Sequence, residues 1–552
     1  MSEMSVRSAA GGPRDHAAVP RPSRRVPSLT PVGAVIAAAT MVSLALLAYQ
    51  LSRPGYLLGV TEYDDGSYVG SALRLVHGDL IYRDFIFVAP PGITLLMAPA
   101  ALLSKVIGTT AATMGIGRIM TGLAAAGAVV LGGLLVRHRG LLAVIVTCGI
   151  LAVYPDTIAA AHTVLLEPWL VLFCLAGAVI VFDGDNLTGS GRRLIWGGVV
   201  FGLAGAIQTW AIFPVAVILA LSLPRPRRAL RYAAGVAIGF LVPVLPFAVL
   251  APRRFYQGLV VAQIGSRAGS ARVADSYRLR QMLGLVYGSV TSHAELDAIA
   301  LALAVVVLAM LAGASLLTRA LPPPLEWFAL GSAALVVAAF LWPDQFHFHF
   351  ASFFAPFLAL SIALPASRLL AGAQFAGQAA QAAPAAGPGS WPGRQWLGWS
   401  VTGLAGAIVI VLTVIQANGE THLATHADPP AAADRIIPPG ACVLTDEVAF
   451  TILANRFVSD VPGCSLMVDG LGTDLALSHG LKPSTGAGRV PAVAAVWSSA
   501  FDHAQYVWLT TLNARRIPWT PALRAYFSKD FVVVLRDGRR DTLYARRGLR
   551  PR

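Results

Sequence analysis

Charged residues are scarce in this sequence. Of its 552 residues, only 13% are Asp, Glu, Lys or Arg, whereas 56% are hydrophobic. An ordinary soluble domain carries roughly 25% charged residues. This shortage excludes a chain whose surface lies mostly in water. Apolar runs of about 20 residues, separated by short basic loops, predict membrane-spanning helices instead.

Acidic residues are the scarcer of the two kinds of charge. The chain has 28 Asp and Glu against 42 Lys and Arg, which gives a formal net charge of +14. In a soluble protein such an excess would indicate nucleic-acid binding. Here the basic residues fall mostly in the tails and in the loops between apolar runs, where orientation in a bilayer explains them. We therefore expect membrane lipids, and no nucleic acid, as partners.

Cysteine is also rare, with four residues. Cys148 and Cys174 lie in apolar segments and are expected to be buried. Cys442 and Cys464 lie in the polar C-terminal region. If that region is outside the cell, the two can form a disulfide; otherwise they are two separate buried thiols. The sequence leaves both interpretations open.

The apolar runs predict an all-α, polytopic membrane domain over residues 31–416, after a disordered cytoplasmic tail at 1–30. The apolar stretch from Ile93 to Gly108 is short for a span. We expect it to be an interfacial helix within a first outer loop, residues 52–112. Residues 194–223 could form one long helix or two short ones. About eleven spans are predicted, at 32–51, 113–136, 140–155, 163–182, 194–208, 210–223, 231–250, 296–318, 326–342, 350–364 and 395–416.

Loop charges predict the orientation of these spans. With the N-terminus in the cytoplasm, the inner loops carry basic residues, such as Arg137 to Arg139 and Arg225 to Arg231, whereas the short outer loops do not. This places a long loop, 251–295, and the C-terminal region, 417–552, outside the cell membrane. Residues 365–394 become a flexible cytoplasmic linker.

The C-terminal region, 417–552, is predicted to be a small extracytoplasmic α/β domain. Short β-like runs alternate there with helix-like stretches, and Asp537-Gly538 favours a hairpin turn. The runs are 441–444, 506–509, 531–535 and 542–545.

The first outer loop holds the most informative segment, from Glu62 to Pro91. Asp64 and Asp65 stand at the start of a predicted amphipathic surface helix, 66–77, where backbone N–H groups and the helix dipole stabilise negative charge. One interpretation is helix capping in a solvated loop. The other is an acidic site at the membrane surface, because aromatic and basic residues accompany the acids ahead of an apolar helix.

These residues resemble a known family. Asp64-Asp65-x-x-Tyr68, followed by Gly78-Asp79 and by Pro90-Pro91 opening an apolar helix, is similar to the first periplasmic loop of GT-C superfamily glycosyltransferases. The nearest pattern is that of protein O-mannosyltransferases and lipid A aminoarabinose transferases, although their second acid is Glu. Arg118 stands where those enzymes carry an Arg. Leu165-Leu166-Glu167-Pro168 resembles their Leu-Leu-Asp motif, with Glu in place of Asp.

The resemblance implies a GT-C fold and an enzyme that moves a sugar from a polyprenyl-phosphate donor to an acceptor hydroxyl on the outer face. Asp64 would be the general base, supported by Asp65 and Glu167. Asp64 and Glu167 could also hold a divalent metal, Mg or Mn. Tyr68, Arg83 and Arg118 are further substrate-binding candidates. The sugar, mannose or arabinose, and the acceptor, a glycan, lipid or protein, stay open.

Two other groups are candidates for substrate binding. Arg267 and Arg272, in the loop 251–295, could bind the lipid phosphate or, alternatively, anionic headgroups. His347 and His349 flank Phe348 at the outer end of a span. The His-x-His spacing suggests a metal site, but we favour substrate hydrogen bonds or anchoring by the neighbouring aromatics.

Two other functions compete with the enzyme. A transporter or flippase for lipid-linked sugars would show mid-span charges and internal repeats, which the sequence lacks. A scaffold with a glycan-binding outer domain would make the acids of the first loop dispensable.

Overall fold

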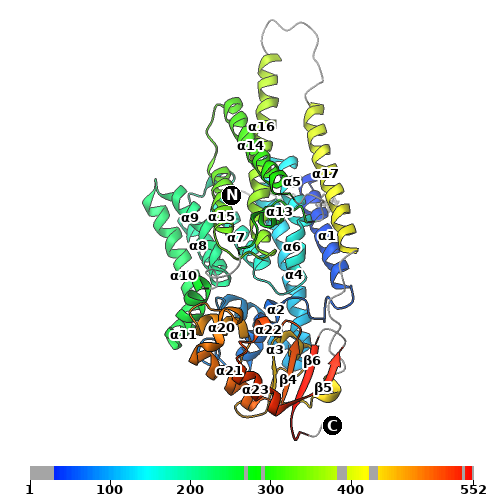
Figure 1. Ribbon diagram of the computed structural model, residues 1–552. Helices are drawn as coiled ribbons and strands as arrows, with labels where there is room; N and C mark the ends of the chain where they lie inside the picture. Colours follow the sequence, from blue (N-terminus) through cyan, green and yellow to red (C-terminus); the bar gives the residue numbers. More distant parts are fainter. Residues whose placement is uncertain are drawn as a thin grey trace, which may run out of the picture.

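The computed structural model describes residues 30–265, 272–286, 292–381, 395–421, 433–537 and 541–549. They form a long helical bundle with an α/β domain at one end (Figure 1). The first-loop helices α2 (Tyr63–Val76) and α3 (Gly92–Ile107) lie at this end of the bundle. The predicted N-terminal tail lies outside the described residues, except Thr30.

Seven helices in the described part of the chain are long and apolar enough to cross a membrane. The bent pair α5 (Leu141–Val153) and α6 (Pro155–Ala161), whose axes meet at 52°, gives an eighth if it counts as one span. The chain is therefore a multi-pass membrane protein. The seven are α1 (Pro31–Leu51), α4 (Thr110–Val136), α10 (Pro226–Leu250), α14 (His293–Thr318), α15 (Pro324–Leu341), α16 (Phe350–Gln381) and α17 (Gln395–Thr421).

Three more predicted spans are helices, but short ones. They are α7 (Glu167–Val181), α8 (Gly191–Ile207) and α9 (Ile212–Ser222), of 15, 17 and 11 residues. At about 1.5 Å per residue, none reaches across the roughly 30 Å of a hydrocarbon core. The expected eleven spans thus include three helices too short for a straight crossing. α8 and α9 are separate because Gln208 between them has an extended backbone.

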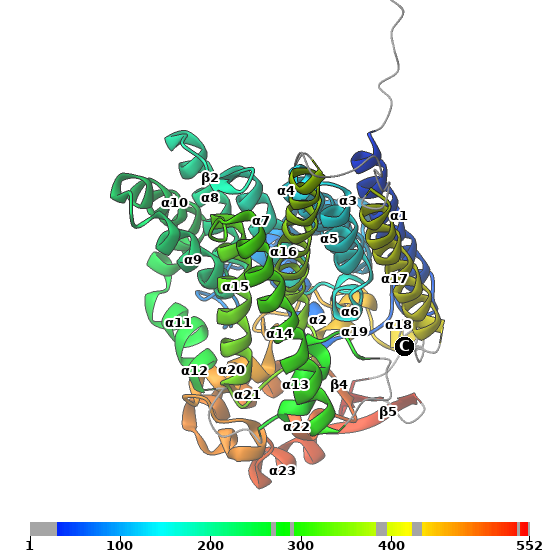
Figure 2. The same cartoon turned by 90° about the horizontal axis from the view of Figure 1, so that it is seen from above.

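Helices α8 and α10 cross with their backbones in contact. The bundle seen from above has α8, α9 and α10 at one edge and α1 and α17 at the other (Figure 2). A Cβ added to Gly202 or to Gly239 would collide with a backbone oxygen of the opposite helix. Small residues at such a crossing allow the close approach by which helices associate in membranes.

Helix α2 is more buried than a surface helix. The sequence predicts its amphipathic face, but Val69, Ala72 and Leu73 are fully covered and Gly66, Ser67 and Ser71 are buried as well. The reason is the C-terminal domain, whose α19 (Val448–Leu453) packs on the side of α2 that the prediction left to solvent. α3 meets the expectation of a short apolar helix, and Leu102, Leu103 and Val106 on it are exposed.

The predicted cytoplasmic linker is shorter than residues 365–394. Helix α16 continues to Gln381, and residues 382–394 lie outside the described part of the chain. The stretch that follows Pro365 is rich in Ala and Gln, which are good helix formers. Low complexity therefore misled the prediction here, because such a composition favours helix as well as flexible coil. The predicted outer loop, 251–295, contains α11 (Pro252–Tyr256), α12 (Ala262–Gly265) and α13 (Asp275–Met282).

The C-terminal domain has a four-stranded sheet in the order β3-β4-β6-β5, in which only β3 and β4 are parallel. The four predicted strands are present, and the predicted turn at Asp537-Gly538 lies partly outside the described residues. Trp497 and Phe501 pack against Val507 and Phe531 to form its core. Its elements are α18 (Ala433–Ile436), β3 (Val443–Thr445), α19, α20 (Gly470–Leu477), α21 (Pro491–His503), β4 (Tyr506–Thr510), α22 (Asn513–Arg516), α23 (Pro521–Asp530), β5 (Phe531–Asp537) and β6 (Asp541–Arg546).

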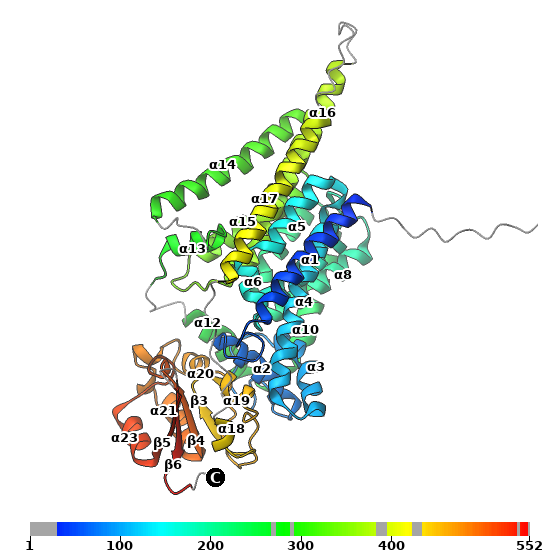
Figure 3. The same ribbon diagram turned by 90° about the vertical axis from the view of Figure 1, so that its right-hand side faces the viewer.

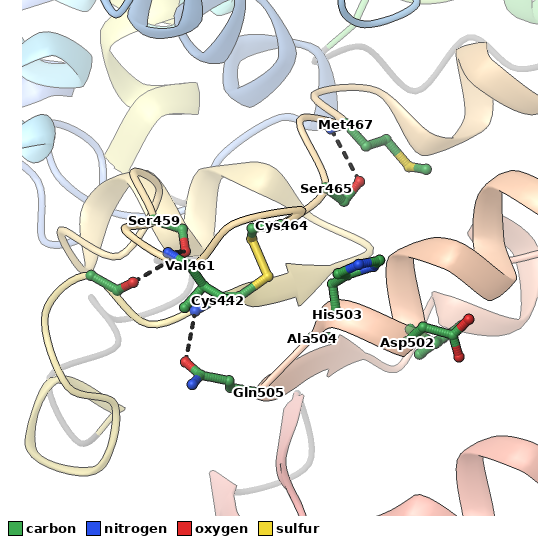
Figure 4. The surroundings of a disulfide bond; sticks show 12 residues. Cys442, Ser459, Val461, Cys464, Ser465, Met467, Asp502, His503, Ala504 and Gln505 are labelled. Carbon is green, nitrogen blue, oxygen red and sulfur yellow. Dashed lines mark hydrogen bonds between the residues drawn. A yellow bond between two sulfur atoms is a disulfide. The ribbon is translucent and has the colours of Figure 1, made fainter.

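A disulfide joins Cys442 and Cys464 (Figure 4). It ties the residue before β3 to the loop that leads towards α20. Beside it, the backbone N–H of Cys442 donates to the Gln505 side chain at 3.1 Å. Of the two interpretations left open above, the structure has the disulfide. Cys148 and Cys174 are free and buried.

Candidate active site

The first turn of α2 lies where the helical bundle meets the C-terminal domain. α19 and α20 of that domain lie next to α2 (Figure 3). Glu62 is the residue before the helix and makes no capping hydrogen bond with its side chain, and Asp64 and Asp65 follow inside the first turn. The acids therefore do not act as side-chain caps, and what each contacts decides its role.

Asp65 is locked in place. Its side chain is inaccessible to solvent and pairs with Arg118 of α4 at 2.6 Å, and the Arg118 side chain is equally buried. The hydroxyls of Thr61 and Thr163 donate to the same Asp65 oxygen at 2.9 and 2.6 Å. Arg118 also donates to the carbonyl oxygens of Tyr56 and Leu57. This pair fixes the start of α2 against α4, and it leaves neither partner able to touch a substrate.

Asp64 differs from Asp65 in both its exposure and its contacts. It is partly exposed, and its carboxylate has no hydrogen-bond partner among the described residues. Desolvation raises the pKa of Asp64 to about 6, with Asp469 and Glu167 adding to the rise and His349 opposing it. Desolvation likewise raises the pKa of Glu62 to about 7. A partly exposed carboxylate with a pKa near 6 is suited to accept a proton near neutral pH.

Glu167 and His349 form a second, buried pair. Glu167 is the first residue of α7, where the helix dipole favours a negative charge. Its Oε2 lies 3.0 Å from His349 Nδ1; the Glu167 side chain is 1% exposed, whereas the His349 side chain is 10% exposed. Desolvation lowers the pKa of His349, but Glu167, together with Asp64 and Glu62, outweighs it and raises the pKa to about 8. His349 is therefore a cation at neutral pH.

His347 stands beside His349, with ring centroids 5.6 Å apart and stacked. Desolvation and the charges of His349 and Lys482 lower the pKa of His347 to about 4, so that ring is neutral at pH 7. Lys482 belongs to the C-terminal domain, so that domain lies near His347. The described residues include no group of three His, Cys, Asp or Glu that could hold a metal ion, and a metal at the two histidines stays a prediction.

Tyr68 and Asp469 complete the surroundings. Burial raises the pKa of Tyr68, and Asp64, Glu167 and Asp469 raise it further, so these three acids act on one ring. Tyr68 packs edge-on against Phe87 at 6.3 Å. Asp469 accepts a hydrogen bond from the Tyr63 hydroxyl at 2.8 Å. Asp469 is the N-cap of α20. Nothing in the sequence indicates that it also contacts α2.

The arginine candidates lie in other contacts. Arg83 pairs with the adjacent Asp84 at 2.7 Å and is half exposed. Arg272 pairs with Asp275 at 3.0 Å and donates to the carbonyl oxygen of Leu341, at the end of α15. Arg267 lies outside the described residues. The structure brings neither Arg83 nor Arg272 into contact with the acids of α2, whereas it does gather Glu167 and His349 around them.

Comparison with known proteins gives likeness in structure only. No family model and no curated protein matches the sequence. ArnT from Cupriavidus metallidurans, solved bound to undecaprenyl phosphate, is 15% identical over 94% of this chain and 98% of that one, with a TM-score of 0.57. Its apo structure gives the same TM-score at 14% identity. The Archaeoglobus fulgidus oligosaccharyltransferase tethered to an acceptor peptide is 13% identical over 87% and 69%, with a TM-score of 0.49.

Proposed function

The chain has the fold of the GT-C glycosyltransferases, and on that premise we propose that it is a membrane glycosyltransferase that uses a polyprenyl-phosphate-linked sugar. The observation that carries the proposal is the contrast within the acidic pair. Asp65 is sealed by Arg118, whereas Asp64 is free of hydrogen bonds to described residues, partly open, and surrounded by Glu62, Glu167 and His349. A proton acceptor beside a buried cation is what transfer from a phosphate leaving group requires.

The proposed reaction is a single displacement. The Asp64 carboxylate takes the proton of the acceptor hydroxyl while that oxygen attacks the anomeric carbon. The new glycosidic bond forms as the bond from the anomeric carbon to the phosphate oxygen breaks, and the polyprenyl phosphate leaves with the bonding electrons. Attack opposite the leaving group inverts the anomeric configuration.

His349 is the proposed partner of the departing phosphate. Its pKa of about 8 keeps it charged, and Glu167 holds the ring through Nδ1, which leaves Nε2 as the donor. A cation placed where charge develops stabilises the transition state more than the ground state. His347, neutral and stacked on it, can add a hydrogen bond to the donor, and Tyr68 borders the same space.

The predicted divalent metal, Mg or Mn, at Asp64 and Glu167 stays a prediction. Glu167 is paired with His349, and the described residues include no group of three His, Cys, Asp or Glu that could hold a metal ion. Mg²⁺ can also be held by one or two carboxylates together with water and substrate phosphates. The displacement proposed here assigns no step to a metal.

We place the reaction on the outer face of the plasma membrane, with the N-terminus in the cytoplasm. The basic residues of the inner loops support this orientation. The disulfide supports it independently, because such bonds persist in oxidising compartments and are rare in the cytosol. The acceptor is a glycan, lipid or protein hydroxyl that reaches the junction of the two domains.

The test is transfer in membranes. Undecaprenyl-phosphate mannose and undecaprenyl-phosphate arabinose, each radiolabelled in the sugar, are incubated with membranes from cells that express the wild type, Asp64→Asn or no protein. We expect the wild type to move label from one donor into a carrier-free product, and Asp64→Asn to match the empty membranes. Equal consumption by the wild type and by empty membranes would refute the proposal for both donors.

A further inference from the structure

Tyr63, the residue before Asp64, is held from three sides by the C-terminal domain. Its hydroxyl donates to Asp469 Oδ1 at 2.8 Å and accepts from the backbone N–H of Leu471 at 3.1 Å. The guanidinium of Arg516 lies over its ring, 4.7 Å from the centroid. These partners lie 406, 408 and 453 positions later in the chain, so a tertiary contact, not local sequence, sets the place of this ring.

The groups that hold Tyr63 are themselves fixed. Asp469 caps α20, because Oδ1 also accepts from the backbone N–H of Gly472 at 2.7 Å, and it is 7% exposed. Arg516 pairs with Glu447 at 2.6 Å, and the Glu447 side chain is 3% exposed. Charge-assisted contacts of this kind are short and directional. The ring is therefore clamped between a rigid acceptor and a rigid cation.

Further contacts along α2 extend the clamp. The Ser67 hydroxyl donates to the carbonyl oxygen of Val468 at 3.0 Å, in a buried position. A Cβ added at Gly66 would stand 2.6 Å from the backbone nitrogen of Ala449, so α19 rests directly on the helix. Successive residues of a helix are rotated by about 100°. Fixing Tyr63, Gly66 and Ser67 thus fixes the direction in which Asp64 points.

We propose that Asp469 and Arg516 are positioning residues that aim Asp64 by clamping Tyr63, so that the C-terminal domain completes the active site. The inference rests on the proposed function, since it assigns these residues to the reaction of Asp64. The inference goes beyond the proposed function by giving the C-terminal domain a part in the chemical step.

Asp469 also has an electrostatic effect that a merely structural contact would not have. Its negative charge raises the pKa of Asp64. In Asp469→Asn, the amide oxygen can still accept from Tyr63 and Gly472, because Asn is as good a cap as Asp. The charge, however, is gone. The pKa of Asp64 then falls, and the base is available at lower pH.

The experiment compares four full-length variants in membranes, with the donor that the wild type uses. Asp469→Asn should keep a kcat near that of the wild type and move the acidic limb of its pH profile to lower pH. Asp469→Ala and Tyr63→Phe should lose about ten- to a hundredfold in kcat, the effect of a misplaced catalytic group, with an unchanged KM for the donor. Asp502→Asn, an exposed acid of the same domain, is the matched control and should change nothing.

The outcomes separate the two proposals. If the wild type moves no label from either donor, the proposed function fails and this inference falls with it. If the wild type is active and needs Asp64, but Tyr63→Phe keeps its kcat and Asp469→Asn keeps its acidic limb, only the clamp is refuted. Tyr63→Phe retains the ring under Arg516, so it tests the hydrogen bond even if Asp469→Ala fails to fold.

Discussion

Adjacent residues of one type have opposite environments in this protein. Asp65 is buried against a buried arginine, and Asp64 is partly exposed with a raised pKa. The sequence predicts the pair and its place at a helix start, because the motif is local. The resemblance already made Asp64 the base and Asp65 its support. It could not show that Asp65 pairs with Arg118, on another helix, and it suggested instead that Arg118 binds substrate.

The two acids should therefore respond differently to the same substitution. Asp65→Asn leaves the Arg118 charge buried without its counter-ion, which costs about 3–5 kcal/mol. Asp64→Asn removes a charge that desolvation disfavours in the folded state, as the raised pKa of Asp64 shows, so it should keep or raise stability at neutral pH. Thermal unfolding in detergent, followed by tryptophan fluorescence, measures both. A stable Asp65→Asn beside an unstable Asp64→Asn would reverse the assignment.

The pH dependence of turnover follows from Asp64 and His349. Asp64 must be deprotonated to act as a base, so kcat should rise as pH passes about 6. His349 must be protonated to stabilise the phosphate, so kcat should fall as pH passes about 8. A bell-shaped profile between these values is the expected result.

Glu167→Gln tests the upper limb of that profile. The carboxylate of Glu167 raises the pKa of His349, so its loss should move the alkaline limb to lower pH. Glu167 also raises the pKa of Asp64, so the acidic limb should move to lower pH as well, but by less. An alkaline limb that stays in place in Glu167→Gln would exclude His349 as the group that titrates there.

At the scale of elements, the site is made where α2, α7 and the C-terminal domain meet. The helices themselves could be predicted because each carries its own apolar pattern. Their meeting could not be predicted, because nothing in the sequence around Asp469 or Arg516 indicates a contact with α2. The same limit explains why α2 was expected on the surface: its second buried face is covered by α19.

Gly66 tests the contact between α2 and α19. A methyl group there would meet the backbone of Ala449, which cannot turn aside as a flexible side chain could. Gly66→Ala should push the two elements apart and lower kcat by about tenfold or more. Gly403 of α17 has nothing within 4 Å of an added Cβ, so Gly403→Ala is the matched control. Equal activity of the two variants would show that the contact does not support the site.

At the scale of the whole molecule, the membrane domain could be predicted from composition and span pattern. Its fold was implied by the resemblance of the first-loop motifs, and the likeness to ArnT agrees with that fold. The number of membrane crossings could not be predicted as reliably from the sequence. A helix of 15 residues and one of 21 look alike in an apolar run, and only the structure shows where each ends.

Topology is open to a direct test. A membrane-impermeant maleimide added to intact cells should label Ser528→Cys, an exposed position in the C-terminal domain, and should not label Arg192→Cys, in a predicted inner loop. The two native free cysteines are buried and should give little background. Labelling of Arg192→Cys alone would invert the proposed orientation.

The central claim is that Asp64 performs chemistry and does not merely bind the donor. The direct measurement uses purified wild type and Asp64→Asn with the undecaprenyl-phosphate sugar that the wild type consumes, and it records donor binding by thermal shift and turnover by release of the labelled sugar. We predict that Asp64→Asn binds the donor as the wild type does and turns over none of it. Turnover by Asp64→Asn near the wild-type rate would contradict the account.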